Sequence, residues 1–323
     1  MIKAEDFRWD IARAGAAACL LEAAAPKVGN VNRHYDFADC LLEDFLLSAM
    51  AIKKPLGWVH RQAVGASILE AVTLTRQITA TNTNLGIVLL MVPLAKAWSQ
   101  LAVADSGDCR IAAPAAGNTA ARHTALVAEL DRVLTALTAS DTRLVYRAIR
   151  LAAPGGLGHA GKHDVYEDAA PPIPLRAAMR LAADRDLIAN EYTNGFHTVL
   201  ESGADSLAQA LNQGLPLPRA VAQLHLWLLS RQPDTLIVRK AGQAAGLAVM
   251  ERAREVWASG GWCTEKGQKK IHELDAWLRQ AGNRLNPGAT ADIAANVLFG
   301  LILEQGPAFW QELRRAEILA AKI

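Results

Sequence analysis

Apolar residues recur at intervals of three and four along most of the chain, with polar residues between them. That spacing gathers the apolar side chains on one face of an α-helix. The two-residue alternation that is typical of strands is nearly absent. The predicted helices span residues 10–25, 38–53, 65–78, 119–136, 175–200, 217–231, 241–258, 266–280 and 290–303. The pattern predicts an all-α fold, a large helical bundle of about a dozen helices joined by polar loops.

The most apolar stretch begins at Leu85 and runs to Leu94. Pro93 and Lys96 interrupt it, so it falls short of the roughly 20 apolar residues that a helix needs to span a bilayer. We expect a buried helix here and no membrane association.

The composition is that of a globular protein with a large core. Of 323 residues, 51% are hydrophobic, which is enough for one large domain or two fused halves. The chain shows no internal repeat, so we expect a single domain over residues 1–323. Lysine and arginine total 34 against 32 acidic residues, and this net charge of +2 is too small to indicate nucleic-acid binding.

The cysteines and the N-terminus both indicate a cytoplasmic protein. Four cysteines lie far apart and form neither a disulfide framework nor a zinc-ligand spacing. The first ten residues carry five charges before any apolar stretch, which is the wrong order for a secretory signal. The oligomeric state is left open, with a homodimer as one option.

The first polar loop, residues 25–37, combines cations, amides and a glycine. Lys27 and Arg33 supply positive charge, Gly29 lets the backbone approach a ligand, and Asn30 can orient a hydroxyl. This mixture suits an anion such as a phosphate. The alternative interpretation is an inter-helix turn whose charges are solvated.

The second polar loop precedes the apolar stretch and contains Asn82, Thr83 and Asn84. Any one of these side chains could cap the helix that follows. Capping accounts for only one of them, and the others would lie at the positive end of a buried helix, where phosphate binds well. A functional role is therefore favoured.

Residues 154–158 are rich in glycine but lack the phosphate-loop pattern, so they are weak support for a nucleotide site. Asp164 follows closely and is a candidate magnesium ligand, although a lone loop aspartate is usually solvated. Within the predicted helix 175–200, Asp184, Glu191 and Asn194 form a polar stripe. Such a stripe lines a site or, more commonly, faces solvent.

Two segments near the C-terminus place acids at predicted helix starts. Asp234 and Thr235 follow a proline and precede Lys240, which is ordinary capping chemistry with added positive charge. A Pro-Gly turn after Asn286 leads to Asp292 on the first turn of an apolar helix. Most such turns are structural.

Taken in order, these segments resemble the triphosphoribosyl-dephospho-CoA synthase family. Its members carry PKPG near the N-terminus, an N-T loop, a D-T segment and an N/S-P-G-x-x-A-D segment near the C-terminus. The corresponding segments here are residues 26–29, 82–83, 234–235 and 286–292, with Glu22 upstream of the first as in the family. The resemblance covers nearly the whole chain.

The resemblance implies a transferase that uses ATP, with magnesium, and a small-molecule acceptor. A hydroxyl of dephospho-CoA would attack the anomeric carbon of ATP's ribose and expel adenine. Glu22, Asp234 and Asp292 are then the candidate catalytic carboxylates, and Asp292 could alternatively lie near magnesium. Asp36, Asp39 and Asp164 are the candidate magnesium ligands. The candidate substrate-binding residues are Lys27, Gly29, Asn30, Arg33, Asn82, Thr83, Asn84, Thr235, Lys240, Asn286 and Gly288.

The chain departs from the family pattern at two places. Citrate-lyase-type members carry N-T-H-K-G where this chain has Asn84 and Leu85 before Gly86, and Val28 replaces the usual proline. The charged pattern of residues 30–49 resembles a second branch, found in organisms that use methanopterin- and methylofuran-type one-carbon carriers. Three functions therefore stay in view: transfer to dephospho-CoA, an ATP-dependent enzyme of one-carbon cofactor synthesis on the same scaffold, and a non-catalytic helical nucleotide-binding protein.

Overall fold

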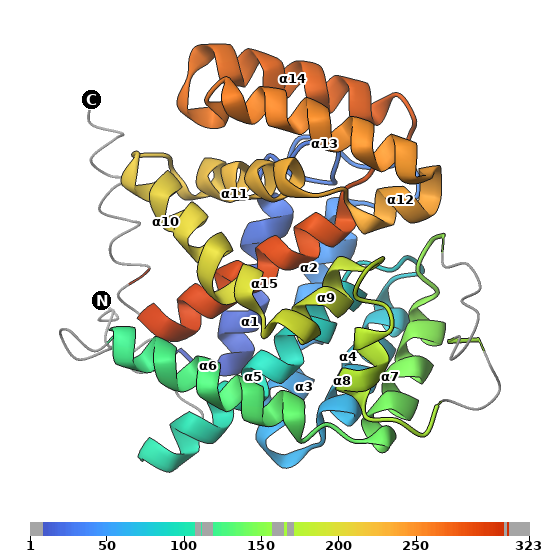
Figure 1. The fold of residues 1–323 in the computed structure, drawn as a ribbon, viewed down its shortest axis with the longest axis vertical. Coiled ribbons are helices and arrows are strands. Elements are labelled where there is room, and N and C mark those ends of the chain that lie inside the picture. Colours follow the sequence, from blue (N-terminus) through green and yellow to red (C-terminus); the bar gives the residue numbers. More distant parts are fainter. Residues whose placement is uncertain are drawn as a thin grey trace.

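The computed structural model describes residues 9–106, 111, 119–156, 165–166, 171–306 and 309. Within these residues the chain is helical and forms no strand, only the isolated bridges between Asn32 and Tyr35 and between Phe37 and Cys40 (Figure 1). The predicted all-α fold is confirmed. The helices are α1 (Ile11–Ala24), α2 (Leu42–Ala51), α3 (Lys53–Gly57), α4 (Val64–Ile78), α5 (Leu85–Ser106), α6 (Thr119–Thr135), α7 (Ala139–Ala152), α8 (Leu175–Arg180), α9 (Leu187–Asn194), α10 (Gly203–Asn212), α11 (Leu217–Arg231), α12 (Thr235–Ala241), α13 (Gln243–Ala258), α14 (Glu265–Arg279) and α15 (Gly288–Gln305).

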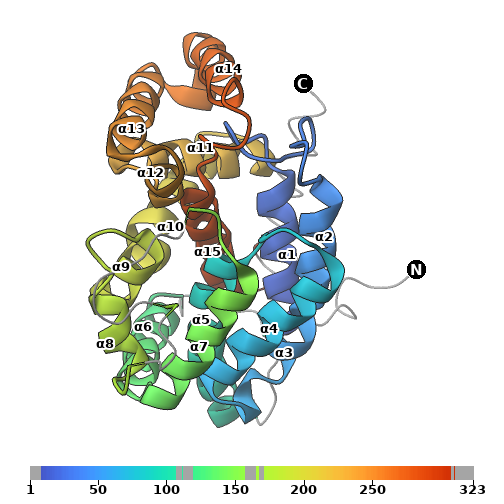
Figure 2. The same ribbon diagram turned by 90° about the vertical axis from the view of Figure 1, so that its right-hand side faces the viewer.

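Helix α15 runs through the middle of the molecule (Figures 1 and 2). It packs against α1, α5, α9, α10, α11 and α12, so it is surrounded on all sides. A helix in this position has to be apolar all round, and the α15 sequence is apolar apart from a few positions. Two of its polar residues, Asp292 and Asn296, therefore stand out in a buried environment.

Helix α5 is the second core helix. Its segment from Leu85 to Ala102 is long and apolar enough to cross a membrane by length and composition alone, but 83% of it is buried inside the protein. Pro93 lies inside the helix without ending it, so the apolar run is longer than the sequence pattern indicated. The expectation of a buried helix is confirmed.

A second, smaller core lies under α11, α12, α13 and α14, which form the upper part of Figure 1. Helix α11 joins the two cores, because Leu224 and Leu228 pack into the main one while Leu226 and Leu229 pack into the smaller one. The single domain over residues 1–323 stays a prediction.

The prediction of one continuous helix over residues 175–200 was wrong. Helix α8 ends at Arg180, and α9 begins only after Asp186, whose carboxylate accepts hydrogen bonds from the amides of Ile188 and Ala189. Gly195 then ends α9 with a left-handed φ of +74°, and a π-helical turn follows from Thr198 to Ser202. The supposed polar stripe is therefore divided between separate elements.

Other boundaries moved because local hydrogen bonds decide them. Helix α2 begins at Leu42 rather than near residue 38, since the carboxylates of Asp36 and Asp44 hold the amides of Leu42 and Leu41. Helices α7 and α10 were missed. A capping box between Thr138 and Asp141 marks the start of α7, and this short motif was the available signal.

The start of α15 is fixed by Asp234, which is completely buried. One carboxylate oxygen accepts from the amides of Leu236 and Ile237 and so caps α12. The other accepts from the amide and the hydroxyl of Thr290, at 2.7 and 2.8 Å. One side chain thus joins the N-terminal ends of α12 and α15.

We expect Thr290→Val to lower the free energy of unfolding by about 1.5–3 kcal/mol, because it removes a buried hydrogen bond to a charged group while keeping the side-chain shape. Urea unfolding measures this. Thr124→Val is the matched control, since the exposed Thr124 hydroxyl bonds only the Ala120 carbonyl of its own helix. It should lower the free energy of unfolding by less than about 0.5 kcal/mol. Equal losses of stability in both variants would contradict the role of Asp234 in joining α12 to α15.

Candidate functional site

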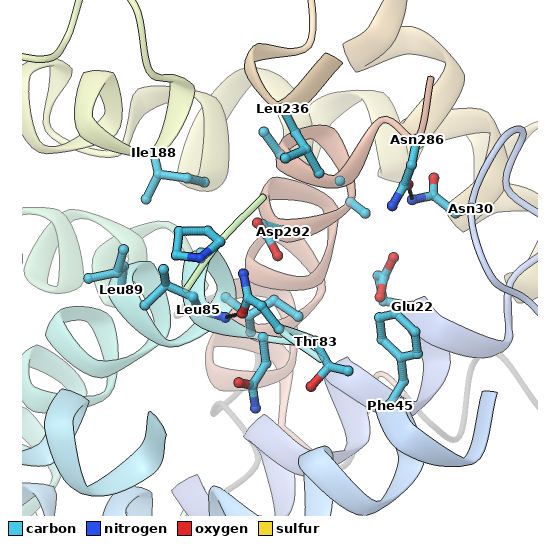
Figure 3. Close-up of a pocket in the computed structure, with 18 of the residues that line it drawn as sticks. Glu22, Asn30, Phe45, Thr83, Leu85, Leu89, Ile188, Leu236, Asn286 and Asp292 are labelled. Carbon is cyan, nitrogen blue, oxygen red and sulfur yellow. Dashed lines mark hydrogen bonds between the residues drawn. The ribbon is translucent and has the colours of Figure 1, made fainter. Parts of the chain in front are cut away.

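A cavity lies where the C-terminal end of α1 faces the N-terminal ends of α5, α12 and α15 (Figure 3). Its volume is about 160 Å³, close to the roughly 150 Å³ that accommodates a benzene-sized ring. A single ring-sized group therefore fits inside. The predicted site residues that line it are Glu22, Lys27, Asn30, Asn82, Thr83, Asn84, Asn286, Gly288 and Asp292.

Glu22 and Lys27 form a buried ion pair in the cavity wall, with 2.8 Å between Glu22 Oε1 and Lys27 Nζ. The ammonium also donates to the carbonyls of Glu22 and, at 3.5 Å, Ala23 in the last turn of α1. Burial raises the pKa of the Glu22 carboxyl, and the Lys27 charge opposes that rise. Lys27 thereby offsets part of the effect of burial on Glu22.

The first loop is tied to the last motif through two asparagines. The Asn30 side-chain amide donates to Asn286 Oδ1 at 2.6 Å. Gly29 supports this arrangement: its amide donates to Asp275 Oδ1 at 2.7 Å, and at its φ of +70° a Cβ would lie 2.8 Å from Leu278 Cδ1. Gly29 is required for close packing of the loop on α14, while Asn30 and Asn286 face the cavity.

Each polar side chain of the second loop has a partner. Asn82 Oδ1 accepts from the Leu85 amide at the start of α5. The Thr83 hydroxyl lies 2.6 Å from the Ser48 hydroxyl on α2, and the Asn84 amide donates to Thr75 on α4. These bonds fix the loop against two helices, so it presents a rigid polar edge to the cavity.

Asp292 differs from the other acids of the site. Within the described part of the chain, its carboxylate receives no hydrogen bond and makes no ion pair. Its pKa is raised well above the usual value, first by burial and then by the nearby carboxylates of Glu22 and Asp234. Gly86 makes room for it, because a Cβ at that position would lie 2.1 Å from Asp292 Oδ2.

Sequence reasoning missed a second ion pair of the lining, between Asp186 and Arg239. Arg239 Nη1 lies 2.7 Å from Asp186 Oδ2, and both residues contact the cavity. Arg239 Nε is buried with no hydrogen-bond partner in the described residues. Asp186 was hidden in the wrongly predicted long helix, and Lys240 was chosen in place of its neighbour. The clue to Arg239 was its position on the helix that Asp234 caps.

Several predicted substrate contacts lie outside the lining. Arg33 is exposed and donates to the Ala24 carbonyl at 2.9 Å. Lys240 donates to the Asn283 carbonyl at 3.2 Å, and burial lowers its pKa. The Thr235 hydroxyl accepts from the Leu187 amide. Asp234, predicted as catalytic, also lies outside the lining, and its carboxylate accepts the four hydrogen bonds that join the starts of α12 and α15.

The predicted magnesium ligands do not come together. Asp36 caps α2 at the Leu42 amide, and Asp39 accepts from the Asn283 side chain at 2.7 Å. Asp164 lies outside the described residues. Across the residues that the structure describes, no group of three or more histidine, cysteine, aspartate or glutamate side chains could hold a metal ion.

The chain is similar to known proteins over most of its length. A family model described as ATP:dephospho-CoA triphosphoribosyl transferase matches residues 8–309. A protein from Pseudomonas fluorescens is 31% identical over 168 residues, covering 50% of this chain and 52% of that protein. One from Pseudomonas paraeruginosa is 30% identical over 105 residues, covering 32% and 35%. Both carry the provisional name 2-(5''-triphosphoribosyl)-3'-dephosphocoenzyme-A synthase. The matched segment thus covers about half of the length of the first relative and about a third of the length of the second.

The fold also matches a solved crystal structure. A protein from Archaeoglobus fulgidus, which carries the provisional name triphosphoribosyl-dephospho-coA synthase, aligns with a TM-score of 0.57 at 24% identity. The alignment covers 80% of this chain and 98% of that one. At this identity the likeness supports the helical architecture.

The raised pKa of Asp292 predicts a pH-dependent stability. Its folded pKa lies above the unfolded value of about 3.9, so the stability it contributes is present below about pH 4 and is lost as the pH rises through the folded pKa. Asp292→Asn has no proton to lose. Between about pH 4 and pH 8, we expect the free energy of unfolding of the variant, measured with urea, to rise relative to that of the wild type. If the free energies of unfolding of the two proteins changed in parallel with pH, the pKa of Asp292 would not be raised in the folded protein.

Proposed function

The chain belongs to the ATP:dephospho-CoA triphosphoribosyl transferase family, and from this premise we propose that it transfers the triphosphoribosyl group of ATP to a hydroxyl of dephospho-CoA and releases adenine. The observation that carries the proposal is the presence of two carboxylates in one cavity, those of the buried Glu22 and the partly buried Asp292. Glycosyl transfer uses carboxylates in this way, because the carbon under attack becomes positively charged in the transition state.

Glu22 is the residue we assign to the acceptor hydroxyl. Its carboxylate is beside the Lys27 ammonium, which stabilises the charged form needed to accept a proton. The side chains of Asn30, Asn286 and Thr83 lie along the same part of the lining and can bond ribose and acceptor hydroxyls. Their own hydrogen bonds hold them in place, so little ordering is required when the substrates bind.

The triphosphate is assigned to Arg239. Lys27 is fully engaged with Glu22 and the end of α1, whereas Arg239 keeps donors beyond the one that bonds Asp186. Arginine suits phosphate because its planar fork of donors matches the phosphate oxygens. Magnesium enters with ATP in this proposal, since it is commonly held by substrate phosphates and one or two carboxylates.

A second acceptor is favoured by one observation. Leu85 lines the cavity where citrate-lyase-type members carry a lysine, while the neighbouring Asn84 bonds Thr75. An apolar group at this place suits an acceptor that is less anionic than dephospho-CoA, such as a precursor of a one-carbon carrier cofactor. The same transfer chemistry would apply. A non-catalytic nucleotide-binding role fits less well, because an ion pair buried against a cavity is costly to maintain.

The cytoplasm is the location we propose, because ATP and CoA precursors are made and used there. Cys19, Cys40 and Cys263 are unpaired, which fits a reducing compartment. The homodimer stays a prediction.

The test is release of free adenine from ATP, measured by liquid chromatography with magnesium and dephospho-CoA. We expect Lys27→Met to reduce the rate by at least about 100-fold, because Glu22 would then lose the neighbouring charge that favours its ionised form. Lys54→Met is the matched control, since Lys54 pairs with Glu70 on the surface, and it should retain the wild-type rate. Wild-type protein that releases no adenine with any CoA precursor would exclude dephospho-CoA. Release with a one-carbon cofactor precursor would establish the second acceptor.

Gly86→Ala should reduce adenine release by at least about tenfold. The new Cβ would lie 2.1 Å from Asp292 Oδ2, so the carboxylate would have to move away. Gly57→Ala makes the same change where the nearest atom, Ala12 Cβ, is 3.7 Å away. It should leave the rate within about twofold of the wild type. Full activity of Gly86→Ala would contradict the placement of Asp292 in the site.

A further inference from the structure

The cavity has two chemically different walls. Leu85 and Leu89 of α5, Ile188 of α9 and Leu236 of α12 form an apolar wall. In Figure 3, Leu85, Leu89 and Ile188 lie on one side of Asp292 and Leu236 lies above it, while the polar side chains lie on the other side together with Phe45. The polar wall contains Glu22, Asn30, Thr83 and Asn286. A ligand that fills the cavity therefore has to be apolar at one end and rich in hydroxyls at the other.

Of the parts of a nucleotide, only the base suits the apolar wall. The four aliphatic side chains offer no donor or charge, so a triphosphate would lose its hydration against them, and ribose hydroxyls would be left without partners. The triphosphate goes instead to Arg239 beyond them, at the ion pair with Asp186. A flat purine ring buries its faces favourably against aliphatic side chains.

We propose that the apolar wall is the subsite for the purine base, and that Asp292 delivers the proton which the base takes up on leaving. This inference rests on the proposed function and adds to it a division of labour between the two carboxylates. Asp292 becomes the acid that faces the departing base. Glu22 remains the base that faces the acceptor.

The surroundings of Asp292 favour a protonated carboxyl. Three carboxylates act on it, those of Glu22, Asp234 and Asp186, against the single opposing charge of Arg239. Arg239 is itself paired with Asp186, which reduces its effect. With no hydrogen-bond donor on Asp292 among the described residues, the charged form has little to stabilise it, and its raised pKa agrees.

Burial raises the pKa of the two other acids of this region as well, but each has partners that oppose the rise and favour its charged form. Glu22 has the Lys27 ammonium at 2.8 Å. Asp234 accepts four hydrogen bonds from the starts of α12 and α15. Environments that separate the pKa values of neighbouring carboxyls assign one as acid and the other as base. Here that assignment is Asp292 as acid and Glu22 as base.

The step balances as follows. The bond between the anomeric carbon and the purine nitrogen breaks, and its electron pair goes to the purine, which takes the Asp292 proton on a ring nitrogen. The acceptor oxygen forms the new bond to the anomeric carbon and gives its proton to Glu22. Adenine leaves neutral. Solvent then returns the proton from Glu22 to Asp292, which restores both residues.

A leaving group that needs no proton separates this role from a structural one. The substrates are ATP and a ribose 5-triphosphate that carries 4-nitrophenol on the anomeric carbon. We expect Asp292→Asn to lower kcat at least about 100-fold on ATP, and less than about tenfold on the nitrophenyl compound, because nitrophenolate leaves without protonation. Glu304→Gln is the control, since this buried acid pairs with His123 away from the cavity, and both rates should be unchanged.

Three results would overturn the assignment of Asp292: equal losses on both substrates, no loss on ATP, or a loss that excess magnesium repairs, which would make Asp292 a metal ligand. Wild-type protein that turns over neither substrate with any acceptor would instead refute the proposed function.

Binding of adenosine, followed by calorimetry, tests the base subsite without turnover. Ile188→Asn should weaken it by about tenfold, because a polar group would face the ring. Leu181→Asn, at a side chain 51% exposed, should not change it. Equal affinity in the wild type and Ile188→Asn would place the base elsewhere.

Discussion

The burial of α15 on every side is the constraint on which the rest of the structure depends. A polar group inside such a helix needs a partner within the protein. Asn296 donates to the Ile87 carbonyl and so aligns α5 with α15. Thr290 and Asp234 do the same for α12. The elements that surround the cavity are therefore held by the polar residues of one central helix.

Asp292 is the exception on that helix, and the exception marks the site. It lies close to Asp234 in space, yet one carboxylate is saturated with hydrogen bonds while the other has none among the described residues. A carboxyl that faces a cavity with a strongly raised pKa is typical of residues that take part in chemistry. Gly86 adds to this, because the backbone of α5 approaches the carboxyl so closely that no side chain fits between them.

The same distinction explains which parts of the site could be foreseen. Lys27, Asn30, Asn286 and Asp292, which line the cavity, were predicted as site residues because short motifs bring together residue types that suit phosphates and hydroxyls. Arg239 was not, because its partner Asp186 is 53 residues away and no motif links them. The predicted metal ligands Asp36 and Asp39 illustrate a related point. Both acids are used locally, one as a helix cap and one as the acceptor of an amide, and a sequence does not show when a carboxylate is already occupied.

The sequence by itself determined the helical class, the core positions of α5 and α15, and the motifs that indicate the family, because these depend on spacing and composition within short segments. It did not determine the break between α8 and α9, because the cap that Asp186 makes on α9 overrides the helix propensity of residues 181–186. Only the tertiary structure decided which acids are occupied and which face the cavity. The pKa of a carboxyl depends on burial and on charges within a few ångströms. For Asp292 those charges come from α1, from the start of α12 and from the start of α9, which are distant in sequence and meet only in the fold.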